Sequence, residues 1–275
     1  AVDTVDPELM GKTPIEAMDT IIETAGELGL KIMLDNHSRA ADGYLNEGLW
    51  YTDGVSEEEW ISDWEMMAQR YAGNDTVVAF DLNNEPHFEA GWGTGNESID
   101  WNKAAERCAE AIHAINSDVL IVVEGVEAVN GEYYWWGGNL KGVRTAPISI
   151  THMDKLVYSA HEYGPEVYEQ PWFTDASFPE NMQAIWDEHF GFVMNENIGH
   201  VLIGEFGIRD ASSNNGSMGV WFDSFLDYMS TDYSWTFWCL NPNSADTGGV
   251  LQDDWISTEQ WKLDALAPYM SPMIP

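Results

Sequence analysis

The segment Val77-Val78-Ala79-Phe80-Asp81-Leu82-Asn83-Asn84-Glu85-Pro86 decides the fold class of this chain. Its first half is a nearly continuous apolar run, as expected of a strand that is buried on both faces of a parallel sheet. Its second half turns polar and ends on a proline, which cannot donate a hydrogen bond to a sheet ladder. A buried strand that ends in polar side chains indicates an α/β protein whose chemistry lies at the carboxyl ends of its strands.

The same pattern recurs along the chain and predicts a repeated β/α unit. Apolar runs occupy residues 31–36, 119–124, 156–161, 201–205 and 234–239, with helical patterns near 57–71, 99–116, 181–195 and 218–229. This alternation predicts a parallel sheet covered by helices, either a barrel or a doubly wound sheet. No linker or low-complexity segment interrupts it, so we expect residues 1–275 to form a single domain.

The first helix is predicted by Thr13 and Glu16, which can form a capping box at its start. Residues with helical spacing are expected to form its apolar face, namely Met18, Ile21, Ile22, Ala25 and Leu28.

The charge of the chain excludes several classes of partner. Asp and Glu number 47 against 11 Lys and Arg, which gives a formal net charge of -36 and would repel nucleic acids and anionic membrane surfaces. The acidic residues are dispersed, so we expect a solvated surface whose self-repulsion is relieved by salt, as in a halophilic protein. An ordinary acidic extracellular protein is the alternative. No run approaches the roughly 18 apolar residues of a membrane helix, and we expect a secreted, extracellular protein with no signal peptide among these residues.

Two cysteines, Cys108 and Cys239, are too few for a disulfide framework and lack the spacing of a zinc site. Both are expected to be small core residues.

Polar residues follow nearly every predicted strand. They are Asp35-Asn36-His37, Asn83-Asn84-Glu85, His161-Glu162-Tyr163, Gly204-Glu205 and Trp238. Glu85 and Glu205 each follow a buried strand directly, and hydrolysis of a glycosidic bond requires such a pair of carboxyl groups. Taken alone, Asn84-Glu85-Pro86 is also compatible with a turn and helix cap, and His161 and Tyr163 with core residues.

An ordered set of motifs resembles the endo-1,4-β-glucanases of glycoside hydrolase family 5. The segments that carry the resemblance are Phe80-Asp81-Leu82-Asn83-Asn84-Glu85-Pro86, Tyr134-Trp135-Trp136-Gly137-Gly138-Asn139-Leu140, Val157-Tyr158-Ser159-Ala160-His161, Ile203-Gly204-Glu205-Phe206-Gly207 and Trp235-Thr236-Phe237-Trp238. The resemblance extends from about residue 13 to 268. It implies an α/β fold of the (β/α)8 TIM-barrel type, in which six of eight β/α units are identifiable here, and a retaining endo-1,4-β-glucanase that needs no cofactor or metal.

The resemblance also implies a role for each site residue. Glu85 would be the general acid/base and Glu205 the nucleophile, with Asn84 bonded to the sugar 2-hydroxyl. Four further residues complete the expected substrate site, with Tyr163 and His161 beside the nucleophile, His37 in the glycone subsite and Trp238 as a stacking floor. Trp136 is expected to stack on the glucan. The acid of such a pair needs a raised pKa, whereas a tyrosine hydroxyl that donates to the nucleophile keeps it ionised.

The chain departs from the family pattern at its start. Ala1 falls where the loop after the second strand of the family barrel is expected, so the first two strands and the arginine that ends the second are not found. Six strands would leave two open edges, at the runs that begin at Lys31 and Ser234. We therefore expect a homo-oligomer that covers the open side.

Other functions remain compatible with the same scaffold. A β-mannanase or a xylanase differs from a β-1,4-glucanase only in its loops. A non-catalytic glucan-binding protein would bind cello-oligosaccharides without releasing reducing ends. In each of these cases the expected partner is a polysaccharide or oligosaccharide.

Overall fold

A computed structural model describes residues 6–40, 43 and 45–271 of the chain. Six parallel strands form one sheet in the order β1-β2-β3-β6-β7-β8. Their bounds are β1 Ile32–Asp35, β2 Val77–Asp81, β3 Leu120–Glu124, β6 Leu156–His161, β7 His200–Glu205 and β8 Ser234–Trp235. Each corresponds to one of the predicted apolar runs, and the sheet is consistent with part of a (β/α)8 barrel.

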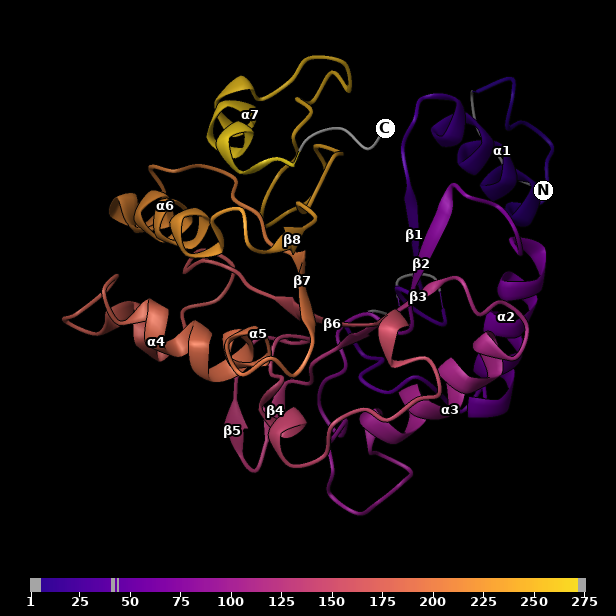
Figure 1. The fold of residues 1–275 in the computed structure, drawn as a ribbon. Coiled ribbons are helices and arrows are strands. Elements are labelled where there is room, and N and C mark those ends of the chain that lie inside the picture. The colour runs from indigo at the N-terminus through magenta and orange to yellow at the C-terminus, as the bar shows by residue number, and fades with distance from the viewer. Residues whose placement is uncertain (1–5, 41–42, 44, 272–275) are drawn as a thin grey trace.

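Helices lie outside the strands, with α1, α2 and α3 beside the first strands and α4, α5 and α6 beside the last (Figure 1). The longer helices are α1 Pro14–Glu27, α2 Glu57–Arg70, α3 Trp101–His113 and α6 Ser217–Met229. The predicted helix at 181–195 is divided into α4 Met182–Trp186, the π-helical η4 Asp187–Gly191 and α5 Phe192–Asn195. This arrangement places the carboxyl ends of all six strands at one end of the sheet, where the loops can build a site.

Short elements fill the connections. They are the hairpin β4 Ala128–Val129 and β5 Glu132–Tyr133, the 3-10 turns η1 Lys141–Arg144, η2 Met153–Lys155, η3 Pro171–Thr174, η5 Asn214–Gly216 and η6 Ala267–Tyr269, and the helix α7 Gln260–Leu266. No helix in the described part of the chain is long and apolar enough to cross a membrane.

The start of α1 is as predicted, because Thr13 accepts the Glu16 N–H and the Glu16 carboxylate accepts the Thr13 N–H. Its apolar face is narrower than predicted. Ile22 and Ala25 are buried, but Ile21 and Leu28 are exposed. The strand expected to run to residue 239 also ends earlier, at Trp235.

The edges of the sheet are the two that the sequence indicated. Within the described residues, β1 pairs only with β2, and β8 pairs only with β7. Just beyond these strands, the rings of His37 and Trp238 stack on each other, with centroids 5.4 Å apart and planes 3° from parallel. The two open edges therefore approach each other at the carboxyl end of the sheet, although no ladder of hydrogen bonds joins them in the part of the chain that the structure describes.

Tryptophans make up much of the core on the α2 and α3 side. Trp50, Trp60 and Trp101 are almost completely buried and lie in mutual ring contact. Cys108 and Cys239 are both free and buried, as predicted for core residues.

Candidate active site

Glu85 and Glu205 meet at the carboxyl ends of β2 and β7. A carboxylate oxygen of each and a ring nitrogen of His161 all lie within 4.8 Å of one another. Glu85 adopts the left-handed backbone region with φ of 46°, which is uncommon for a residue with a side chain. Its position therefore depends on surrounding contacts that hold this conformation.

His161 lies between the two glutamates, and Tyr163 contacts Glu205. The His161 Nδ1 atom lies 3.0 Å from Glu85 Oε1 and 3.5 Å from Glu205 Oε2. The Tyr163 hydroxyl donates to Glu205 Oε2 at 2.6 Å. Because His161 and Tyr163 flank Glu162 at the end of β6, their side chains project to the same side of the chain and reach the same carboxylate pair.

The pKa values in this cluster are set by burial and by charge. Burial raises the pKa of Glu205 to about 7, while the charge of His161 and the hydrogen bond from Tyr163 act in the opposite direction. The hydrogen bond from Tyr163 thus favours the ionised form of Glu205, but burial has the larger effect on its pKa. Burial alone would lower the pKa of His161, yet the surrounding carboxylates hold it well above its ordinary range.

A cleft of about 750 Å³ opens above the pair. Six of the eight predicted site residues line it, namely His37, Glu85, Trp136, Tyr163, Glu205 and Trp238. Trp136 stacks on His87 with ring centroids 3.8 Å apart, and Trp238 stacks on His37. Each indole is therefore supported on one face by an imidazole and remains partly exposed.

The other two predicted residues, His161 and Asn84, are buried and are not among the residues that line the cleft. His161 is 2% exposed and reaches the carboxylates from below. Asn84 is also buried, and its backbone N–H donates to the Asn36 carbonyl at 3.0 Å.

Several buried polar residues at the strand ends were missed by the sequence predictions. Glu124 ends β3 and is 1% exposed, and its Oε2 accepts the Glu85 N–H at 2.8 Å. Asp81 ends β2, and burial raises its pKa well above the ordinary range. Glu124 follows an apolar strand as directly as Glu85 and Glu205 do, so that signal was present in the sequence.

Glu162 is a third buried carboxyl group, which the sequence analysis placed at a strand end without assigning it a role. It is fully buried between His161 and Tyr163, and accepts hydrogen bonds from the Tyr134 hydroxyl and, at 3.0 Å, from the Trp221 indole. Since Tyr134 begins the segment that carries Trp136, Glu162 links the end of β6 to an aromatic wall of the cleft.

The loop tryptophans divide into two groups. Trp50 and Trp92 lie in segments that contain glycine, but both are buried and absent from the cleft lining. Trp135 and Trp136 do line the cleft. A tryptophan beside a glycine or proline in the sequence is therefore not always exposed, because some loops of this chain pack their tryptophans into the core.

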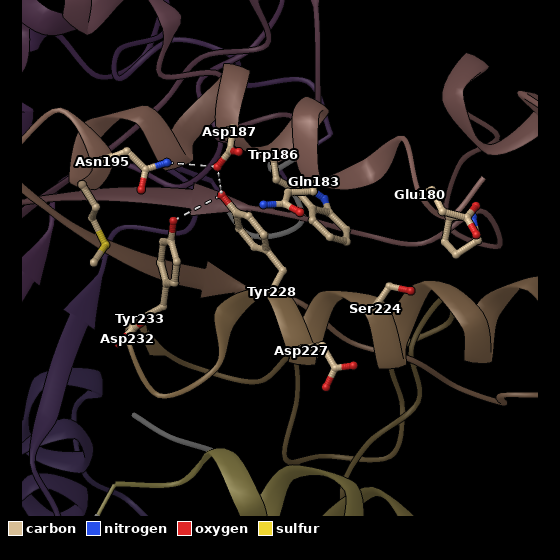
Figure 2. Close-up of a pocket in the computed structure, with 12 residues that line it drawn as sticks. Glu180, Gln183, Trp186, Asp187, Asn195, Ser224, Asp227, Tyr228, Asp232 and Tyr233 are labelled. Carbon is tan, nitrogen blue, oxygen red and sulfur yellow. Dashed lines mark hydrogen bonds between the residues drawn. The ribbon is translucent and has the colours of Figure 1, made fainter. Parts of the chain in front are cut away.

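A second hollow, of about 800 Å³, lies between the α4 to α5 segment and α6 (Figure 2). Its floor includes Trp186 and Tyr228, and the Tyr228 hydroxyl donates to Asp187 at 2.9 Å. Its rim is acidic, with Glu180, Asp227 and Asp232. None of the predicted site residues lines it, and Trp186 is too deeply buried to offer an open ring face.

Within the described residues, Glu85, His161 and Glu205 are the group whose ligand atoms are close enough to hold a metal ion. Two of its members are carboxyl groups, and hydrolysis of a glycosidic bond requires a pair of carboxyl groups at such a distance.

A parallel β/α sheet with two glutamates, a histidine and a tyrosine at its strand ends defines a barrel glycoside hydrolase. The comparison with known families agrees with this class. Residues 3–244 match the model of the family "Cellulase (glycosyl hydrolase family 5)". The chain therefore belongs to this family.

Known relatives support the assignment. An endoglucanase from Paenibacillus polymyxa is 46% identical over 99% of this chain and 70% of its own length. The major extracellular endoglucanase of Xanthomonas campestris pv. campestris is 38% identical over 94% of this chain, which spans only 54% of that relative. A variant of an endocellulase from Pyrococcus horikoshii, solved in complex with cellotetraose, superimposes with a TM-score of 0.91 at 38% identity, covering 97% of this chain and 76% of that one.

Proposed function

We propose that this chain is the catalytic domain of a retaining endo-1,4-β-glucanase, with Glu85 as general acid/base and Glu205 as nucleophile. The observation that carries the proposal is the close approach of the two carboxylates, whose oxygens lie within 4.8 Å of each other. Retaining glycosidases hold their carboxyl groups roughly 5 Å apart, whereas inverting enzymes leave more room for a water molecule.

The reaction would proceed in two displacements. Glu205 attacks the anomeric carbon while Glu85 gives its proton to the departing glycosidic oxygen, so that a covalent glycosyl ester forms as the bond to the leaving sugar breaks. Glu85, now ionised, takes a proton from water, and the resulting hydroxide displaces Glu205 from the anomeric carbon. Both carboxyl groups return to their starting protonation states.

The remaining residues have supporting roles in this proposal. The Tyr163 hydroxyl stabilises the ionised Glu205 until it attacks. Trp136 and Trp238 offer indole faces for sugar rings, His37 contacts the glycone sugar, and Asn84 bonds the 2-hydroxyl group. No cofactor takes part in these steps.

A β-1,4-glucan is the proposed substrate, because the relatives named above are endoglucanases and one neighbour was solved with cellotetraose. These comparisons favour a glucan over mannan or xylan. The Xanthomonas relative is named as an extracellular endoglucanase. We propose that this chain is secreted as well.

The variants Glu85→Gln and Glu205→Gln test the assignment. The assay is reducing-sugar release from carboxymethylcellulose in high salt. Each variant should lower the rate by about a hundredfold or more, because each removes a reacting group. Binding of cello-oligosaccharides should persist, since the stacking surfaces remain. Near-normal turnover by either variant would exclude its residue from the chemistry.

A further inference from the structure

Glu124 contacts both the backbone of Glu85 and the ring of His161. Its Oε2 atom accepts the backbone N–H of Glu85 at 2.8 Å. Its Oε1 atom lies 3.4 Å from the Nε2 atom of His161. One buried carboxyl group thus touches the backbone of the proposed acid/base and the ring that lies between the two reacting carboxylates.

The surroundings of Glu124 fix it firmly in place. The Trp101 indole donates to the Glu124 carbonyl at 2.9 Å. Gly137, with φ of 67°, packs against the carboxylate so closely that a Cβ atom there would overlap Oε2. A side chain that is held at both ends can transmit its position to the groups that it contacts.

The contact with the Glu85 N–H has a specific consequence. Glu85 lies in the left-handed region, where a residue with a side chain is strained by roughly 1–3 kcal/mol unless its neighbours hold it. The hydrogen bond that its amide donates to the buried Glu124 carboxyl group is one contact that selects this conformation.

The contact with His161 fixes the protons of the imidazole ring. Nδ1 faces the carboxylates of Glu85 and Glu205, and Nε2 faces Glu124. Because both ring nitrogens face acceptors, each can carry a proton, and the ring then holds a positive charge between the reacting groups. Two further carboxyl groups act on Glu124, those of Asp35 at the end of β1 and Asp81 at the end of β2.

We propose that Glu124 is a positioning residue of this site, which holds the Glu85 backbone and orients the His161 ring between the two reacting carboxylates. The inference rests on the proposed function, because it assigns a role relative to Glu85 and Glu205.

Glu124→Gln is the informative substitution. The two contacts are made by different oxygens of Glu124, whereas only one of the two terminal atoms of glutamine is an acceptor, so its amide oxygen can serve the Glu85 N–H or the His161 Nε2–H but not both. We expect kcat to fall about tenfold to a hundredfold through misplacement of the acid/base. The KM for cello-oligosaccharides should change less than about twofold, because Glu124 does not line the cleft.

The pH profile separates this role from a purely structural one. Burial raises the pKa of Glu124 well above its ordinary value, so Glu124 titrates together with His161 and the two glutamates. Glu124→Gln removes this ionisable group and weakens proton binding by the rest of the cluster, so the alkaline limb of kcat/KM should move to lower pH by about one unit. Glu124→Asp keeps an ionisable carboxyl group but shortens the side chain by one methylene group. It should lower kcat while the alkaline limb stays near its wild-type position.

Glu106→Gln is the matched control. Like Glu124, Glu106 accepts a backbone N–H, that of Ser149 at 3.0 Å, and does not line the cleft. Unlike Glu124, it makes no hydrogen bond or ion pair with Glu85, His161 or Glu205 among the described residues. This variant should retain wild-type kcat and pH profile, with folding of all variants checked by thermal unfolding.

The outcomes are distinct. Wild-type kcat and an unmoved alkaline limb in Glu124→Gln would overturn the inference. If that variant does not fold, Glu124→Asp decides, and wild-type kcat there would overturn it equally. Activity of Glu85→Gln measured in the same series reports on the proposed function separately, because that variant must be inactive whether or not Glu124 positions it.

Discussion

Glu162 is a fully buried carboxyl group whose hydrogen bonds come from neutral donors, the Tyr134 hydroxyl and the Trp221 indole. Burial raises its pKa from 4.5 to about 7, although these hydrogen bonds act in the opposite direction. The folded state therefore binds the Glu162 proton more tightly than the unfolded state does. Its contribution to stability is complete below about pH 4.5 and is lost as the pH rises through about 7.

Glu162→Gln should remove this pH dependence, because the amide stays neutral. The shift corresponds to about 3 kcal/mol, so the variant should gain up to this free energy of unfolding relative to wild type between pH 5 and pH 8. Urea unfolding at the two pH values measures the difference. Asp63→Asn, an exposed change on α2 that also removes one negative charge, is the control and should show no comparable gain.

The residues of the cleft were largely predictable because each follows a buried strand or belongs to a family motif. His37, Tyr163 and Trp238 were expected beside the two glutamates, and all three line the cleft. Their roles stay predictions. Glu124 was missed because an acidic residue at a strand end was weighed only where a family motif accompanied it. Asp81 lies inside such a motif, but no role was assigned to it.

At the scale of elements, the six strands were predictable because long apolar runs separated by helical patterns have few other solutions. The two edge strands followed from their order along the chain, and β1 and β8 do occupy the edges. The capping box of Thr13 likewise specified the start of α1.

Other elements depend on tertiary contacts that a local pattern does not contain. The hairpin of β4 and β5 has only two residues in each strand. The π turn at Asp187–Gly191 interrupts a helix whose sequence shows no break. Ile21 and Leu28 were expected on the buried face of α1, but the described residues do not cover that side.

At the scale of the whole molecule, the net charge of -36 is the dominant electrostatic feature. Close carboxylates repel one another until salt screens them, with a Debye length of about 10 Å at 0.1 M and about 3 Å at 1 M. We therefore predict that the melting temperature and the activity both rise as sodium chloride increases from low to molar concentration. A flat or falling melting temperature, followed by circular dichroism, would contradict a halophilic surface and leave the glycosidase assignment intact.

The open side between β1 and β8 bears on assembly. Self-association through these edges stays a prediction for the 275 residues, because unpaired strand edges beside an apolar core are costly to expose. The stacked rings of His37 and Trp238 narrow the opening at the catalytic end, so an assembly would leave the cleft accessible only if it covers the opposite part of the gap.

The anomeric configuration of the first product tests the central claim most directly. Two displacements at the same carbon restore the original configuration, so wild-type hydrolysis of a cello-oligosaccharide should release the β-anomer before mutarotation. Proton NMR in molar sodium chloride follows the anomeric signals from the first minutes of the reaction. Initial appearance of the β-anomer is the predicted result, and initial appearance of the α-anomer would show that Glu205 does not form a covalent intermediate.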